Sequence, residues 1–138
     1  MTHQVELTPI EIWQEISIYT GFLAQIRLRR VCTKLQQLEI HDFYNIDDKY
    51  LTLLTNQILE YYPFIQYLKA IHPKITNINH LTKLKRLDAS DSSGLDDHGV
   101  QSVNPIELNI SNNSKITNIN HMTRLQRLYA TNLSAINN

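Results

Sequence analysis

The only cysteine of the chain, Cys32, lies in the stretch 26–35 beside three arginines and a lysine. Basic neighbours lower the pKa of a thiol and make it nucleophilic, and a basic stretch also binds phosphate groups. On a helix, however, Cys32 shares an apolar stripe with Leu28 and Val31, whereas most of the basic side chains occupy the opposite face. Burial among apolar side chains leaves a thiol inert, and about three phosphate contacts give only weak, salt-sensitive binding. The pattern favours a structural cysteine and a solvated basic face over a reactive thiol or a nucleic-acid site.

Histidines and acidic pairs are the other side chains that could carry out chemistry. His80 and His121 occupy matching places in a repeated stretch, and strands stacked about 4.8 Å apart, with one between, start the two rings roughly 10 Å from each other. Zinc–nitrogen bonds of ~2.0–2.1 Å do not bridge that gap easily. The acidic pairs 47–48 and 96–97 each open a turn before an apolar stretch, which favours backbone capping over acid–base catalysis. Because GxSxG, P-loop and HExxH motifs are also missing from the sequence, it predicts a non-enzymatic protein without cofactor or metal.

The composition is balanced. Lysine plus arginine equals aspartate plus glutamate, 13 each in 138 residues, so no overall field draws the chain to nucleic acid or to an anionic membrane. The first residues lack the basic-then-apolar pattern of a signal peptide, and no apolar run approaches the ~20 residues of a membrane span. The expected location is intracellular, either cytoplasmic or nuclear, with neither membrane nor nucleic acid as a partner.

The first 62 residues show helical patterns. Thr8 as N-cap, Pro9 at the first helical position and Glu11 three residues after the cap mark a helix start. Apolar residues then recur at helical spacing in two stripes, Ile12, Ile16 and Tyr19, and Leu28, Val31, Cys32, Leu35 and Leu38. A further helix is predicted over 47–61, ending before Pro63. Its inward-facing residues would be Leu51, Leu54 and Ile58.

The segment Thr8–Leu38 resembles the F-box motif without a gap. Pro9 and Glu11 match its opening Pro-x-Glu, and LRRVC at 28–32 matches its LR-x-VC signature. The segment departs from the motif at Thr8, at 24–25 and at Leu35, where leucine, Asp-Leu and tryptophan are usual. The resemblance implies a three-helix module that docks the Skp-type adaptor of a cullin-RING ubiquitin ligase; the alternative is an unrelated helical cap on the repeats. The residues implied in adaptor binding are Leu7, Pro9, Ile12, Ile16, Leu28, Val31 and Leu35.

The second half of the chain repeats itself. KITNINHLTKLKRLDAS at 74–90 recurs as KITNINHMTRLQRLYAT at 115–131, 41 residues later, with a unit of half that length between the two. This period and the signature L-x-x-L-x-L are typical of a leucine-rich repeat. The sequence therefore predicts strands near 65–70, 84–89, 105–110 and 125–130.

The segments between these strands have a pattern of their own. Apolar residues recur there at every third position, as in Ile75, Ile78, Leu81 and Leu84. Such spacing indicates a tight, 3₁₀-like return. Asn113 occupies the turn position where leucine-rich repeats carry a backbone-binding asparagine, while Pro73, Ser92 and Leu133 hold the equivalent places. The array should therefore be irregular.

Together these patterns predict an α/β repeat fold, with an N-terminal three-helix F-box at 5–46 and a short leucine-rich-repeat solenoid at 47–138. By resemblance, the chain would be the substrate-recognition subunit of an SCF-type cullin-RING ubiquitin ligase. Its partners would be a Skp-type adaptor, through it a cullin, and an unknown protein target. Two alternatives of another class remain, a stand-alone repeat module that binds protein and a decoy that occupies the adaptor without delivering a substrate.

The predicted target surface is the outward face of the repeat strands. Side chains alternate along a strand, so the residues between the leucines line this face. Tyrosine and arginine are frequent anchors of protein interfaces, although any one of these side chains could equally be a solvated residue that keeps the sheet soluble. The residues predicted to bind a target are Tyr67, Lys69, Arg86, Asp88, Glu107, Asn109, Arg127 and Tyr129.

Overall fold

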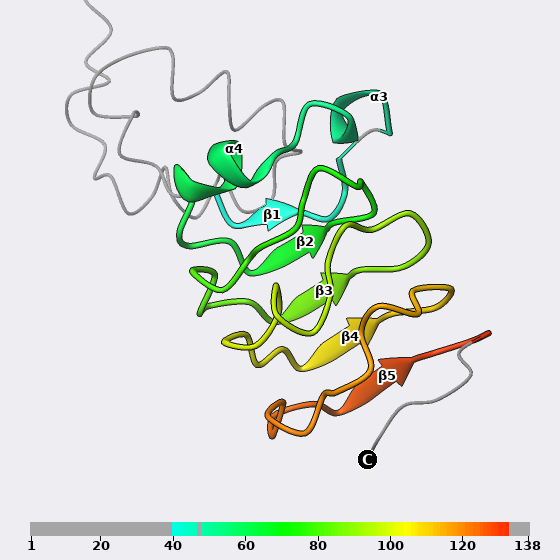
Figure 1. The fold of residues 1–138 in the computed structure, drawn as a ribbon. Helices are drawn as coiled ribbons and strands as arrows, with labels where there is room; N and C mark the ends of the chain where they lie inside the picture. Colours follow the sequence, from blue (N-terminus) through cyan, green and yellow to red (C-terminus); the bar gives the residue numbers. More distant parts are fainter. Residues whose placement is uncertain (1–39, 47, 133–138) are drawn as a thin grey trace, which may run out of the picture.

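The computed structural model describes residues 40–46 and 48–132, which form one parallel sheet with two short helices. The strands follow one another across the sheet in chain order: β1 (Asp42–Phe43), β2 (Tyr67–Lys69), β3 (Arg86–Asp88), β4 (Glu107–Asn109) and β5 (Arg127–Tyr129). Helices α3 (Asp48–Leu51) and α4 (Asn56–Glu60) lie between β1 and β2 in the chain. From β2 on, strands start 19, 21 and 20 residues apart (67 to 86, 86 to 107, 107 to 127), and we call each such segment a coil. Figure 1 shows the strands stacked as successive rungs.

The predicted fold class is wrong. An α/β repeat made of a three-helix F-box and a leucine-rich-repeat solenoid requires substantial helix, whereas the described residues form a five-stranded parallel sheet with almost none. The two helices have four and five residues. Most of the predicted F-box, 5–46, lies outside the described residues, and at its end the chain forms β1 instead of a helix.

The segments between strands return through isolated turns. Between β2 and β3, the N–H of Ile75 donates to the carbonyl of His72, and the N–H groups of Leu81 and Leu84 donate three residues back in the same way. Turns of this kind bring every third side chain to the inner side, and the apolar residues at that spacing are buried: Ile75, Ile78, Leu81 and Leu84. An α-helix has 3.6 residues per turn and needs spacings of three and four. A constant spacing of three therefore fits a chain of turns, and it explains why these returns contain no helix.

The single helix predicted over 47–61 is also wrong, because two short helices occupy this stretch. Thr55 lies between them in an extended conformation, with φ −138° and ψ 165°, and its side chain accepts a hydrogen bond from the Ile58 N–H. Thr55 is thus the N-cap of α4, and a cap has non-helical backbone angles. The predicted inward residues Leu51 and Leu54 are buried, and Ile58 packs partly buried against the core.

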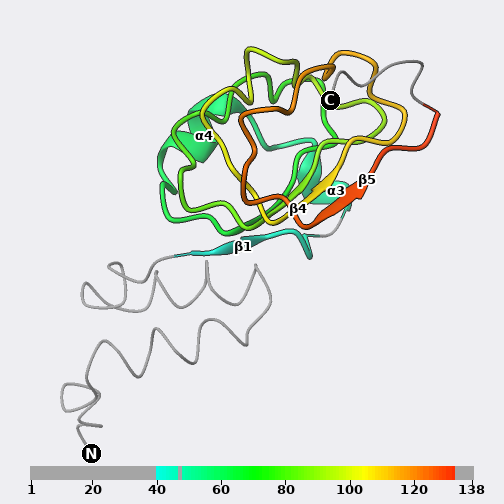
Figure 2. The same ribbon diagram turned by 90° about the horizontal axis from the view of Figure 1, so that it is seen from below.

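Each strand sends its core residue to the same side of the sheet. The register places Phe43, Leu68, Leu87, Leu108 and Leu128 side by side. The first four are at most 1% exposed, whereas Leu128 on β5 is 39% exposed. Full burial of such a side chain stabilises a fold by roughly 1.5–3 kcal/mol. In Figure 2 the strands lie along one side of the stack and the returning segments along the other. The buried side chains of both sides form one core cluster.

Asn113 joins neighbouring coils within this core. Its side chain is buried, and its Nδ2 donates to the carbonyls of Ala89 at 2.8 Å and Leu95 at 3.2 Å. Its Oδ1 accepts the Lys115 N–H at 3.1 Å. In the preceding coil the equivalent residue is the buried Ser93, whose Oγ accepts the N–H two residues on, and not the exposed Ser92 named from the sequence. The coil from β3 to β4 has 21 residues, one more than the coil from β4 to β5. Counting from the strands in the sequence therefore placed the equivalent of Asn113 one residue too early, at Ser92.

The four strands β2 to β5 lie within the segments 65–70, 84–89, 105–110 and 125–130 in which the sequence predicts strands. Strand β1 was not predicted, because its residues fell in the segment assigned to the F-box. The signal was present nonetheless. Ile40 and Phe43 are buried and three residues apart, as Ile65 and Leu68 are at β2 and Leu84 and Leu87 are at β3.

Candidate functional site

The outward face of the sheet carries two rows of side chains, one from the first and one from the third residue of each strand from β2 to β5. Strand register aligns them across the sheet. The first row is Tyr67, Arg86, Glu107 and Arg127, and the second is Lys69, Asp88, Asn109 and Tyr129. We call these eight residues the sheet face. They are the residues that the sequence predicts to bind a target, and the fold brings all of them onto one surface.

Glu107 is the centre of the first row. Its side chain is only 11% exposed, and a carboxylate shielded from water to this degree needs compensating charge. Arg127 approaches Oε2 with Nε at 3.1 Å and Nη2 at 2.9 Å. Arg86 Nε lies 3.0 Å from Oε1, as an ion pair whose N–H is not aimed well enough for a hydrogen bond. One carboxylate thus holds two guanidinium groups in place, with Arg127 bound more directionally than Arg86.

Tyr44 extends this cluster beyond β1. The guanidinium carbon of Arg86 lies 4.0 Å from the centre of the Tyr44 ring, within the range of a cation–π interaction. Burial raises the pKa of Tyr44, and the charges of Asp88 and Glu107 raise it further, while Arg86 partly offsets the rise. The phenol therefore stays neutral at physiological pH. Tyr44 presents a ring that orients Arg86, and sequence reasoning missed it together with β1.

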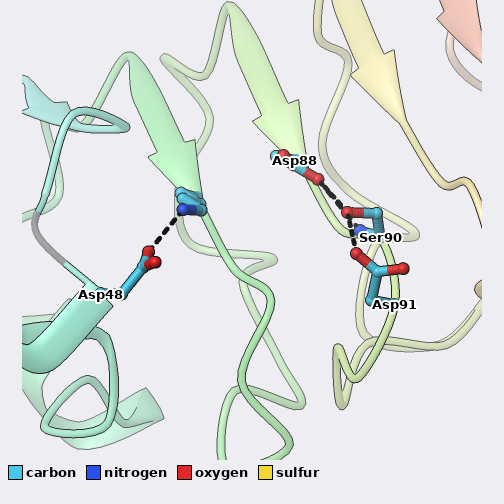
Figure 3. A network of polar contacts seen from close by, with 5 residues as sticks. Asp48, Asp88, Ser90 and Asp91 are labelled. Carbon is cyan, nitrogen blue, oxygen red and sulfur yellow. Dashed lines mark hydrogen bonds and ion pairs between the residues drawn. The ribbon is translucent and has the colours of Figure 1, made fainter.

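The second row has mainly structural partners. Lys69 Nζ lies 2.8 Å from Asp48 Oδ1 at the start of α3. The Asp48 carboxylate is largely exposed, so the pair has little energetic weight. Asp88 Oδ1 accepts the N–H of Ser90 at 3.1 Å and its hydroxyl at 2.6 Å. Figure 3 shows Asp48 pointing toward the end of β2, and Asp88, Ser90 and Asp91 joined in a chain of contacts. Asn109 makes the same turn contact with the N–H two residues on. Lys69, Asp88 and Asn109 are thus engaged within the chain.

The groups of the sheet face that remain open to solvent are arginines and tyrosines. The side chain of Arg127 is 65% exposed although it binds Glu107, and Tyr129 is 50% exposed. Tyr67 is also exposed, and Arg86 is half-exposed. Within the described part of the chain, the side chains of Tyr67 and Tyr129 make no hydrogen bond or ion pair. These four residues form the part of the surface that a partner can contact directly.

The acidic pair 96–97 has structural contacts within and between coils. Asp96 Oδ1 accepts the Gly99 N–H at 2.8 Å, which is a capping contact. Asp97 receives the N–H groups of Thr117 and Asn118 and the Thr117 hydroxyl from the next coil. Burial works to raise the pKa of Asp97, but these hydrogen bonds and the nearby His121 outweigh it and lower that pKa below its ordinary value. Asp97 therefore serves as an anionic acceptor for backbone groups.

The two histidines differ in their environment. His121 Nε2 lies 3.0 Å from the Val100 carbonyl oxygen, while His80 Nε2 is shielded from solvent and has no hydrogen-bond partner among the described residues. Within residues 40–46 and 48–132, no group of three or more His, Cys, Asp or Glu side chains is arranged to hold a metal ion. In the same part of the chain, the helices are too short and too polar to cross a membrane.

The residues predicted to bind an adaptor lie outside the described residues, and so does Cys32. This set is Leu7, Pro9, Ile12, Ile16, Leu28, Val31 and Leu35. Their roles stay predictions. Comparisons of the chain with family models, with curated proteins and with solved structures gave no match. The features that indicate a function are therefore the sheet face and the F-box-like segment Thr8–Leu38.

Proposed function

We propose that the described stack of coils is a protein-binding module without enzymatic activity, and that its partner docks on the sheet face. The observation that carries this proposal is the pair of arginines held on Glu107 beside exposed tyrosines. Arginine and tyrosine are enriched among the residues that dominate the binding energy of protein interfaces. The contact residues are Tyr67, Arg86, Arg127 and Tyr129.

The fixed position of the arginines strengthens the case. A flexible arginine loses rotamer entropy when a partner immobilises it, which reduces affinity by roughly 0.5–1.5 kcal/mol per side chain. Here Glu107 and Tyr44 already restrict Arg86, and Glu107 restricts Arg127. A solvated face that only keeps the sheet soluble would not need a shielded carboxylate beneath two arginines. The arrangement is that of a preorganised surface, which binds at a lower entropic cost.

The test compares variants on inner strands with matched variants elsewhere. Tyr67→Ala with Arg86→Ala removes one tyrosine and one arginine from the sheet face and leaves β5 unchanged. Tyr61→Ala with Arg124→Ala removes the same residue types from other exposed positions. Proteins enriched on the wild-type chain, quantified by mass spectrometry, should be lost on the first variant and retained on the second.

An anchor of this kind contributes about 2 kcal/mol or more, so each removal should weaken binding by roughly 30-fold. Both variants should keep the wild-type circular dichroism spectrum and unfold cooperatively. Equal enrichment on the two variants would refute the docking site, since the sheet-face residues would then matter no more than other exposed residues.

A ubiquitin-ligase role is the more specific form of this proposal. We base it on the resemblance of Thr8–Leu38 to the F-box, which implies a Skp-type adaptor and, through it, a cullin, with catalysis left to the partner enzymes. Pro9→Ala with Ile12→Ala should abolish co-purification of the adaptor and leave binding at the sheet face intact. If cullin is recovered in full with that variant, the F-box-like segment is not what joins the chain to a ligase. If no adaptor binds the wild type, the chain is a stand-alone binding module. A decoy would bind the adaptor and enrich no target.

A further inference from the structure

The β5 edge of the sheet exposes a core residue that every other strand buries. Leu128 is 39% exposed, while its counterparts in the register, Leu68, Leu87 and Leu108, are at most 1% exposed. Among the described residues, β5 pairs with β4 only. The difference therefore comes from the missing neighbour and not from the residue type, because all four positions are leucine.

The same edge has backbone groups whose equivalents are hydrogen-bonded in each earlier coil. The N–H groups of Ala70, Ala89 and Ile110 each donate to the next strand, and the carbonyls of Gln66, Lys85 and Ile106 each accept two N–H groups from it. The corresponding groups of the last coil are the Ala130 N–H and the Gln126 carbonyl. Neither has a partner among the described residues. An exposed row of such groups is a template for another strand.

Leu128 lies at the centre of this row. The Arg127 N–H and the Tyr129 carbonyl bond toward β4. Since the direction of backbone groups alternates along a strand, the N–H and carbonyl of Leu128 point to the open side. The open edge thus presents, in order, the Gln126 carbonyl, both groups of Leu128 and the Ala130 N–H. When a second copy of the strand runs in the opposite direction, the Gln126 carbonyl of one copy faces the Ala130 N–H of the other, and the two Leu128 residues face each other. The edge is therefore complementary to itself.

We propose that two copies of this chain associate through this edge, with their β5 strands antiparallel about a two-fold axis at Leu128. Each Leu128 then exchanges two backbone hydrogen bonds with its counterpart, and each Gln126 carbonyl accepts from the partner copy's Ala130 N–H. The two exposed leucines meet and extend one core into the other. The five strands of each copy join in a ten-stranded sheet, with five from each copy. This association uses the edge of the sheet, and of the four proposed contact residues on the sheet face it involves only Arg127 and Tyr129 of β5.

The side chains on the sheet face fit the same pairing. In an antiparallel pair centred on Leu128, each Arg127 lies directly opposite a Tyr129 of the other copy. Opposed residues of such a pair are close enough for their side chains to interact, and an arginine over a tyrosine ring is a favourable contact. Both residues are largely exposed in the single chain. The closed two-fold arrangement also satisfies the edge without leading to an open filament.

Cysteine cross-linking tests the register directly. In a Cys32→Ala background with oxidised glutathione, Leu128→Cys should form a disulfide-linked dimer, because opposed Cα atoms in a hydrogen-bonded pair are about 5.5 Å apart and disulfides span about 4.4–6.8 Å. Arg127→Cys and Tyr129→Cys are the matched controls. Each alone places its cysteines diagonally, about 7–8 Å apart, beyond that range. A mixture of these two controls should cross-link as a heterodimer, since residues 127 and 129 oppose each other.

The expected result is a rate at least ~10-fold higher for Leu128→Cys, and for the mixture, than for either control alone. The mixed pair leaves Leu128 unchanged, so it decides the question if Leu128→Cys folds poorly. Sedimentation of the wild type should show a mass that rises toward twice that of the monomer with concentration. Similar rates of disulfide formation for all variants would overturn the proposal. This result is expected if another segment of the chain covers the edge. A monomeric mass at every concentration up to about 1 mM would overturn the proposal as well.

Discussion

Replacing Asn113 by alanine should destabilise the fold more than any other single asparagine substitution in the described coils. Asn113 is 1% exposed and makes three hydrogen bonds, all to backbone groups. The change leaves the carbonyls of Ala89 and Leu95 and the N–H of Lys115 without this partner. A buried polar group left unsatisfied costs about 1–3 kcal/mol. Since Lys115 is exposed and water can reach part of this site, we expect a total loss of about 3–5 kcal/mol.

A series of variants separates the bonds. Asn113→Ser keeps the acceptor for the Lys115 N–H, as Ser93 does for its own turn, but loses both donor contacts. It should destabilise the chain by about two-thirds of the alanine value, because two of three bonds are lost. Asn120→Ala is the control. Its side chain is exposed and makes no hydrogen bond among the described residues, so its effect should stay within about 0.5 kcal/mol.

Urea denaturation followed by circular dichroism measures these differences. Domains of this size are stable by about 5–15 kcal/mol in total, so the Asn113→Ala variant should show a clearly lower midpoint with an unchanged slope. A loss below about 1 kcal/mol would show that water replaces the Asn113 contacts fully. The reasoning that this residue ties two coils together would then be wrong.

Two further predictions concern contacts between coils. Gly99→Ala should lower the free energy of unfolding by about 1–3 kcal/mol, since the added Cβ would lie 2.1 Å from the Thr76 carbonyl oxygen; urea denaturation measures this. The lowered pKa of Asp97 stabilises the fold above the ordinary value of 3.8 and less so as the pH falls through the lower folded-state pKa. Asp97→Asn keeps an acceptor oxygen but should lose this acid-dependent part of stability. The melting temperatures of the wild type and the variant, measured from about pH 2 to 6, should therefore converge at the acid end. Parallel curves would contradict this role of Asp97.

The strand positions could be predicted because the pattern that sets them is local. Alternation around Leu87 or Leu108 identifies a strand from a few residues, and the repeat of 41 residues fixes the spacing. The helical content was wrong because it came from a family resemblance and from apolar periodicity in 47–61, which does not show where a helix is interrupted. Thr55 interrupts it by capping α4, and only the hydrogen bond to Ile58 reveals that role.

The interactions across the sheet face were predicted in part. Arg86 and Arg127 are separated by the 41-residue repeat, with Glu107 on the strand between them, so their alignment follows from the spacing. Their convergence on a single carboxylate does not, since it depends on side-chain rotamers in three coils. Tyr44 was missed for a similar reason, because its contact with Arg86 spans two rungs of the sheet.

The repeat itself indicates which position of the sheet face is free to serve binding. At the third residue of β3 and β4, Asp88 and Asn109 accept the N–H two residues on and hold the turn that follows. At the same place in β5 the residue is Tyr129, whose ring cannot accept this bond, and the Thr131 N–H bonds instead to the Ser111 hydroxyl of the preceding coil. The chain thus gives up a local stabilising contact at this position and gains an exposed aromatic ring. Lys69 of β2 departs from the pattern as well, but its side chain pairs with Asp48. Positions where a fold departs from its own stabilising pattern are those where function is expected, and Tyr129 is the more exposed of the two on this surface.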